Sequence, residues 1–281
     1  MTELLLEESR WPAGLPAAHR DLLRSILEGA RKATGVVGLA AGGSFASGKM
    51  DEFSDIDLVV AVEPSAEVGR PESRRAFAGS LGPLLAAFPG DHVGEPRLLI
   101  CLYGPPPVHV DFKFVTLQEL ARRVEDPVVL WEHDGRLREA LGAGAAAYPE
   151  PDLQWSEDRF WVWVHYAAAK IGRGELFEAL DLLAFLRSRV LGPLSLAEAS
   201  ARPNGLRRLE EAAPRRAGEM RETVARHDPK DCIRALRAAI AMYRDLRDRG
   251  GAAHIRVNAG AERAAVDHLD SVEAVLEPTR D

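Results

Sequence analysis

Cysteine is scarce in this chain of 281 residues, which contains only two, Cys101 and Cys232, each within an apolar run. Two distant cysteines in apolar surroundings argue against a disulfide or a cysteine-based metal site, so we expect both to be buried small residues. No run approaches the roughly 20 apolar residues that a membrane-spanning helix needs. The first twelve residues also lack the basic and apolar segments of a secretion signal. We therefore expect a cytoplasmic protein without membrane association.

An excess of basic charge is absent as well, because the formal net charge is −7. Residues 1–150 contain 15 lysines and arginines against 22 aspartates and glutamates, whereas residues 151–281 contain 21 of each kind. A nucleic-acid-binding domain usually carries a basic patch or stripe, so this balance disfavours a nucleic-acid substrate. A negatively charged surface instead attracts cationic small molecules.

The hydrophobic pattern divides the chain into a mixed first part and a helical second part. Short apolar runs bounded by turn residues predict strands at 35–41, 56–62, 97–104 and 108–116. Helical spacing predicts helices at 15–33, 71–88 and 117–126, and a short one after Gly42. No strand pattern follows residue 150. The sequence thus predicts an α+β fold, with a small mixed sheet and helices in a domain of residues 1–150 and a helical bundle in a domain of residues 151–281.

The most informative segment is residues 42–60, which read GGSFASGKMDEFSDIDLVV. Asp55 and Asp57 flank Ile56 at the start of an apolar strand, and residues i and i+2 of a strand point to the same face. Carboxylates of this kind are the oxygen ligands that Mg²⁺ combines with substrate phosphates. The turn at Gly43 and Ser44 can offer backbone N–H groups and a hydroxyl to a phosphate. Together these features predict a site of nucleotidyl transfer.

The same segment contains GSFASGK, the body of a phosphate-binding P-loop. A P-loop needs a serine or threonine after the lysine to bind Mg²⁺, and a long helix that continues from it. Met50 occupies the serine position, and the next predicted strand begins at residue 56. We therefore reject the P-loop interpretation.

The segment resembles the signature of the polymerase β-like nucleotidyltransferase superfamily, in which a Gly-Ser turn precedes an Asp-x-Asp pair. Its form is similar to that of nucleotidyltransferases that modify aminoglycoside, streptomycin- or lincosamide-type antibiotics, with matches at Gly43, Ser44, Gly48, Asp51, Ser54, Asp55, Ile56 and Asp57. Phe45 departs from the pattern, because many members carry arginine there. The resemblance implies a third carboxylate on a later strand, and Asp111 fits because it alternates with apolar residues in VHVDFKFV. His109 and Lys113 share its face and are interpreted as neighbours.

The resemblance also implies the cofactors. Asp55, Asp57 and Asp111 would hold two Mg²⁺ ions, one at the nucleotide phosphates and one that activates the acceptor hydroxyl for attack on the α-phosphorus. The turn at Gly43 and Ser44 would contact ATP or another nucleoside triphosphate. Lys170 would reach the phosphates from an aromatic-rich segment that resembles the one in streptomycin- and lincosamide-type enzymes.

The general base is left open at this point. Kanamycin-type relatives carry a glutamate four residues before the comparable lysine, where this chain has Tyr166. Polymerase-like members use the third aspartate, so Asp111 is the first choice. The other candidates are Glu157, His165, Tyr166 and Glu175.

The predicted function is the transfer of a nucleoside monophosphate, AMP from ATP in the first instance, to a hydroxyl of a small cationic molecule such as an aminoglycoside- or lincosamide-like antibiotic. Two other interpretations stay open. One is nucleotidyl transfer to RNA or to a protein partner, as in the toxin–antitoxin type, and the other is a degenerate module that only binds nucleotide. The acceptor, the nucleotide preference and the oligomeric state are left open by the sequence.

Overall fold

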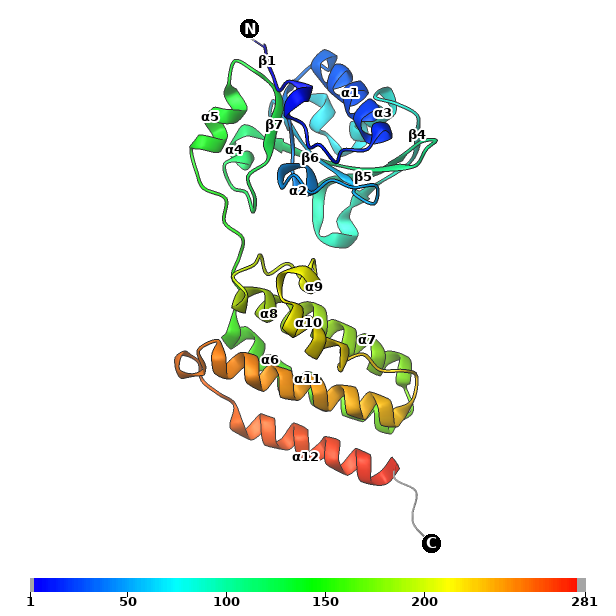
Figure 1. Cartoon of the computed structure of the whole chain (residues 1–281), viewed down its shortest axis with the longest axis vertical. Coiled ribbons are helices and arrows are strands. Elements are labelled where there is room, and N and C mark those ends of the chain that lie inside the picture. Colours follow the sequence, from blue (N-terminus) through cyan, green and yellow to red (C-terminus); the bar gives the residue numbers. More distant parts are fainter. Residues whose placement is uncertain (1–2, 277–281) are drawn as a thin grey trace. The chain divides into compact units, whose positions relative to one another are not determined.

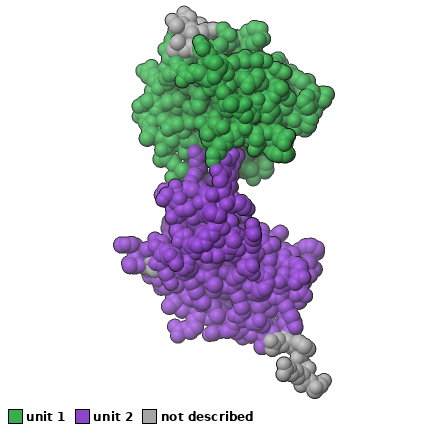
Figure 2. All heavy atoms as spheres, in the orientation of Figure 1, with its two compact units in different colours: residues 1–148 green, residues 149–281 purple. Residues whose placement is uncertain are grey.

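The computed structural model of the chain describes residues 3–276, and the chain divides into two compact units, residues 1–148 and 149–281 (Figures 1 and 2). Each unit has a large hydrophobic core of its own. The first unit is a mixed sheet with helices, and the elements described in the second are helical. The predicted α+β fold class is thereby confirmed.

The first unit is built on a seven-stranded sheet with the order β1-β7-β2-β3-β6-β5-β4. Its strands are β1 (Glu3–Leu5), β2 (Val36–Ala41), β3 (Ile56–Val62), β4 (Leu84–Gly90), β5 (Glu95–Tyr103), β6 (Val108–Thr116) and β7 (Val128–His133). The central pair β3 and β6 is parallel, and the other neighbouring pairs are antiparallel. The parallel register places Asp57 beside Asp111.

Helices cover the two faces of this sheet unequally. On one face, α1 (Ala17–Lys32) and α3 (Pro71–Ser80) pack on the main core of the unit. On the other face, α4 (Leu117–Leu120) and α5 (Arg136–Gly142) cover a smaller core on β2, β7 and the later residues of β3 and β6. The residues of β5 and β6 alternate between buried and more exposed. The second face is therefore open where it carries Asp57 and Asp111.

The second unit consists of helices that pack around one core. They are α6 (Leu153–Gly172), α7 (Leu176–Leu186), α8 (Gly192–Glu198), α9 (Leu209–Ala212), α10 (Pro214–Arg221), α11 (Pro229–Arg249) and α12 (Ala259–Leu276). The ring of Phe160 on α6 stacks on Tyr243 of α11 with their centroids 3.9 Å apart. Asp152 begins α6 because its carboxylate accepts a hydrogen bond from the Trp155 N–H. Among residues 3–276, no helix is long and apolar enough to cross a membrane.

Two predicted helices of the first unit were too long. The helix predicted at 71–88 ends at Ser80, and β4 follows, because Pro83 lacks an N–H and cannot continue a helix. The helix predicted at 117–126 is the single turn α4, which begins with a capping box between Thr116 and Glu119. Pro127 disfavours the helical conformation of the residue before it. The strand prediction also omitted β1, β4 and β7.

Candidate active site

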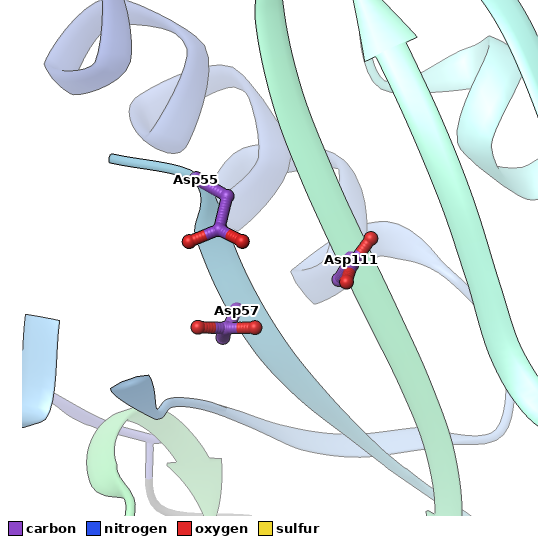
Figure 3. Close-up of side chains that lie close together, drawn as sticks. All are labelled: Asp55, Asp57 and Asp111. Atoms are coloured by element: carbon purple, nitrogen blue, oxygen red, sulfur yellow. The ribbon is translucent and has the colours of Figure 1, made fainter. Parts of the chain in front are cut away.

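The three aspartates predicted from the sequence lie together on the open face of the sheet (Figure 3). Asp55 immediately precedes β3, Asp57 is the second residue of β3, and Asp111 is its neighbour on β6. Each offers one carboxylate oxygen, and these oxygens lie within 4.8 Å of one another. All three residues are half-buried. Like charges this close repel, and a divalent cation that prefers oxygen ligands would offset the repulsion.

The glycine turn is fitted closely to this cluster. The Gly42 N–H donates a hydrogen bond to the backbone carbonyl of Asp57 over 2.9 Å. Gly43 opens α2 (Gly43–Ala46) with φ +53°, a left-handed conformation that favours glycine. A Cβ atom on Gly43 would lie 2.0 Å from Oδ2 of Asp57. The backbone of the turn therefore approaches the carboxylate as closely as it does because this residue has no side chain.

The predicted phosphate contacts of the turn are engaged within the protein. The Gly43 N–H donates to Oε1 of Glu125 over 3.3 Å. The Ser44 hydroxyl is buried and lies 3.0 Å from the sulfur of Met50. Phe45, at the position where the resemblance expects arginine, is buried and packs edge-to-face on Trp11. This position of α2 therefore belongs to the core and supplies no charge to the site.

The loop between α2 and β3 is held by its own polar side chains. The Asp51 carboxylate accepts hydrogen bonds from the Phe53 N–H and the Ser54 hydroxyl, over 3.0 and 2.9 Å. The Ser54 hydroxyl accepts one from the Asp51 N–H. The carbonyl of Ser54 lies 2.8 Å from Nε2 of the buried His19 on α1. Asp51 and Ser54, which both belong to the motif, thus fix the conformation of the loop that leads into β3.

The neighbours of Asp111 on β6 have different partners. Nε2 of His109 lies 2.8 Å from Oδ1 of Asp111, and this hydrogen bond, with the nearby negative charges, raises the pKa of His109. The Lys113 ammonium lies 2.8 Å from Oε2 of Glu95 instead. Hydrogen bonds from Arg97 first and then from Lys113 lower the pKa of Glu95 to about 2. His109 is thus in contact with the aspartate cluster, as its i, i+2 spacing from Asp111 on the same strand face indicates.

Lys170 belongs to a charged group within the second unit. Its ammonium lies 2.5 Å from a carboxylate oxygen of Glu175 and 2.5 Å from one of Glu178. It also lies 5.0 Å from the ring centroid of Tyr166. These hydrogen bonds, the one to Glu175 first, raise the pKa of Lys170, so its ammonium is charged at neutral pH. Its contact with nucleotide phosphates stays a prediction.

His165, another candidate base on α6, is exposed. Its ring stacks on that of His268 in α12, with the centroids 4.3 Å apart and an interplanar angle of 25°. The contact joins α6 to α12. A role as a base stays a prediction for His165, as it does for Tyr166 and Glu175.

Glu157 lies in the core of the second unit, where only 1% of its surface is exposed. Its carboxylate accepts hydrogen bonds from the Trp161 indole N–H over 3.1 Å and from the Tyr243 hydroxyl over 2.7 Å. It accepts a third from the backbone N–H of Asn258 over 2.9 Å. A buried carboxylate with three donors joins α6 to α11 and to the segment before α12, which favours a structural role over proton transfer.

We expect Glu157→Ala to lower the free energy of unfolding by about 3 kcal/mol, because it leaves the buried donors of Trp161 and Tyr243 without an acceptor in the core. Urea unfolding of the full chain, followed by circular dichroism, measures the change. The matched control is Asp158→Ala, since Asp158 is the next residue of α6 and is exposed, with an expected change within about 0.5 kcal/mol. Unchanged unfolding with loss of nucleotidyl transfer would instead identify Glu157 as the base.

Comparisons with known proteins give a match to one family and similarities to solved structures. Residues 23–89 match the family described as a nucleotidyltransferase domain. A comparison with curated proteins gave no match. Among solved structures, the chain is similar to an aminoglycoside 6-adenyltransferase from Bacillus subtilis, at 12% identity and a TM-score of 0.42, over 90% of this chain and 97% of that one. It is also similar to a nucleotidyltransferase-like protein from Exiguobacterium sibiricum 255-15, at 15% identity and a TM-score of 0.39, over 82% of this chain and 76% of that one.

The family match and the site coincide in the sequence. The matched residues contain the turn at Gly43 together with Asp55 and Asp57. They end before Asp111, which the fold brings to the same pair. The N-terminal unit therefore contains a match to a nucleotidyltransferase domain over residues 23–89, and this match supports an enzyme of the transferase class.

Proposed function

We propose that this protein transfers a nucleoside monophosphate, AMP from ATP in the first instance, to a hydroxyl of a small molecule. The observation that carries the proposal is the cluster of Asp55, Asp57 and Asp111 beside the turn at Gly43, within a domain that matches the nucleotidyltransferase family. Residues 1–150 would be the catalytic domain. Residues 151–281 are the proposed helical domain for binding of the substrate or nucleotide.

The donor set of the cluster fits Mg²⁺. It offers three carboxylate oxygens within 4.8 Å of one another, and its half-buried residues leave room for phosphate oxygens as further ligands. We assign two ions to it, as the resemblance implies. When bound, Mg²⁺ would offset the negative charge of the triphosphate and make the acceptor hydroxyl a better nucleophile.

The remaining roles fall to residues of the chain. Asp111 is the proposed general base, because it lies on the open face and can accept the acceptor proton. Gly43 and Ser44 are the proposed phosphate contacts at the start of α2. Since Gly43 donates to Glu125 in this structure, binding of a phosphate at its N–H requires that carboxylate to move. Lys170 is the proposed contact from the second unit.

The acceptor is proposed to be a cation. The first 150 residues carry seven more acidic than basic side chains, which favours approach of a positively charged molecule and disfavours RNA. An aminoglycoside- or lincosamide-like compound is one member of this class. The predicted cytoplasmic location agrees with this chemistry, because nucleoside triphosphates are abundant there.

The test is transfer of label from α-labelled ATP to a panel of hydroxylated cationic small molecules, with total RNA and the protein itself as competing acceptors. We expect label on a small molecule in the presence of Mg²⁺, and none when the metal is chelated. ATP with Mg²⁺ at about 100 times its dissociation constant should stabilise the protein by about 2.7 kcal/mol, and ATP with chelator should not. Label that appears on RNA or protein alone contradicts a small-molecule acceptor, and absence of metal-dependent ATP binding contradicts the enzyme assignment.

A further inference from the structure

The open face of β5 is apolar where it borders the aspartate cluster. Along this strand Leu99, Cys101 and Tyr103 are buried on the covered face. Ile100 and Leu102 alternate with them and point to the open face, where Ile100 is half-buried and Leu102 is 39% exposed. A strand with one face in water usually alternates apolar and polar residues. This strand is apolar on both faces, so its open face is suited to cover by another molecule or surface.

The strand register connects this apolar surface to the cluster. Ile100 of β5 pairs directly with Asp111 of β6, and Leu102 pairs with His109. On the other side, Phe88 of β4 pairs with Ile100 and is 49% exposed. Directly paired side chains of antiparallel strands lie about 5 Å apart on the same face. Phe88, Ile100 and Leu102 therefore form an apolar strip that begins beside Asp111 and runs to β4, the edge strand of the sheet.

The polar surroundings of the strip define what it can bind. On the side toward β3 it meets three carboxylates, which attract a cation. Lys113, the nearby ammonium on β6, is paired with Glu95, so its positive charge is largely compensated. A ligand that lies on the strip thus has an apolar part on β4 and β5, and a cationic or metal-bound polar part at the aspartates.

We propose that the apolar strip binds the apolar part of the acceptor and so places the acceptor hydroxyl next to Asp111. This inference rests on the proposed nucleotidyl transfer and narrows its substrate class to amphipathic amino alcohols, in preference to polycations that are polar on all sides. Continuity with the cluster is the reason for choosing the acceptor as occupant, because the strip starts at the residue paired with Asp111. Phe88 and Leu102 would then determine specificity without touching the nucleotide.

The test uses a homologous series of acceptors, the 2-(alkylamino)ethanols with methyl, butyl and hexyl chains. These are cations at neutral pH that differ only in apolar length. We expect kcat/KM for transfer of labelled AMP to rise about threefold for each added methylene that contacts the strip. Calorimetric titration of the hexyl compound into the full chain, saturated with Mg²⁺ and a non-hydrolysable ATP analogue, measures binding independently of turnover.

The double variant Phe88→Ser/Leu102→Ser should remove most of the dependence on chain length, through a KM for the hexyl compound that rises about a hundredfold if all five added methylenes contact the strip. Its dissociation constant for Mg²⁺ with the ATP analogue should stay unchanged, which also shows that the domain is folded. The matched control is Leu5→Ser, because Leu5 is 51% exposed on β1 at the opposite edge of the sheet. In this control, kcat/KM should depend on the length of the alkyl chain as it does in the wild type.

The outcomes separate the two proposals. Binding and transfer that are independent of chain length, or no binding of the hexyl compound to a protein that binds Mg²⁺ and the ATP analogue, overturn the inference about the strip and leave the proposed function standing. Failure to bind Mg²⁺ and the ATP analogue overturns the proposed function itself. A double variant that keeps the wild-type dependence shows that the strip is not the acceptor site.

Discussion

Asp57→Asn should lower metal-dependent nucleotidyl transfer about a thousandfold or more while the fold stays intact. Asp57 belongs to the aspartate cluster, and its carboxylate is also the one that the turn at Gly43 approaches most closely, so it would hold the metal next to the proposed phosphate contact. The change keeps the size of the side chain and removes one negative charge from the donor set. A metal ion supplies several kcal/mol of stabilisation to a phosphoryl transition state, and about 4 kcal/mol corresponds to the expected factor.

Three measurements test this expectation together: transfer of label from α-labelled ATP, calorimetric binding of Mg²⁺ with an ATP analogue, and thermal unfolding. Without metal, Asp57→Asn should be at least as stable as the wild type, because the substitution relieves repulsion among three carboxylates. Asp21→Asn is the matched control, since Asp21 is 72% exposed on α1 and pairs only at the surface with Arg24. If Asp57→Asn keeps metal-dependent turnover, the aspartate cluster is not the catalytic site.

The sequence predicted the parts of the fold whose patterns are local. Residues 56–62 form β3 as predicted, because a short apolar run that is bounded by turn residues and contains β-branched residues is typical of a buried strand. β4 was missed because most of its residues are partly or fully exposed, so it lacks the alternation by which a strand is recognised. β1 has only three residues and depends on pairing with β7. Such pairings are tertiary contacts that a single sequence does not display.

The candidate site likewise has residues that a local sequence pattern predicts and contacts that depend on the tertiary fold. Asp55 and Asp57 could be predicted because they share one strand. Asp111 could be predicted because the family resemblance implies a third carboxylate on a later strand, and the alternation of VHVDFKFV places this aspartate on a polar face. The parallel pairing that brings Asp57 beside Asp111 is a property of the sheet. Contacts of the site that span long sequence distances, those of His19 with Ser54 and of Glu125 with Gly43, gave no local signal. Glu125 was assigned to a helix, and the structure places it in the segment between α4 and β7.

Gly43→Ala should reduce nucleotidyl transfer at least about a hundredfold and also lower stability. Gly43 has φ +53°, and a residue with a side chain in that conformation lowers the free energy of unfolding by about 1–2 kcal/mol. The added Cβ would lie 2.0 Å from Oδ2 of Asp57, so that the carboxylate or the turn must shift. A displacement of about 1 Å within a catalytic arrangement is enough for a hundredfold loss. One methyl group should therefore disturb the Asp57 carboxylate and the proposed phosphate contact together.

Gly135→Ala separates the catalytic effect from backbone strain. Gly135 precedes α5 with φ +73°, and a Cβ there meets no atom within 4 Å. This control should lose a similar 1–2 kcal/mol of stability from backbone strain and keep full transfer activity. Urea unfolding and transfer of labelled AMP, measured on both variants at a temperature where each is folded, give the comparison. Equal activities of the two variants would show that the turn at Gly43 can move away from Asp57 without cost to the reaction. The close approach of the turn to that carboxylate would then have no catalytic role.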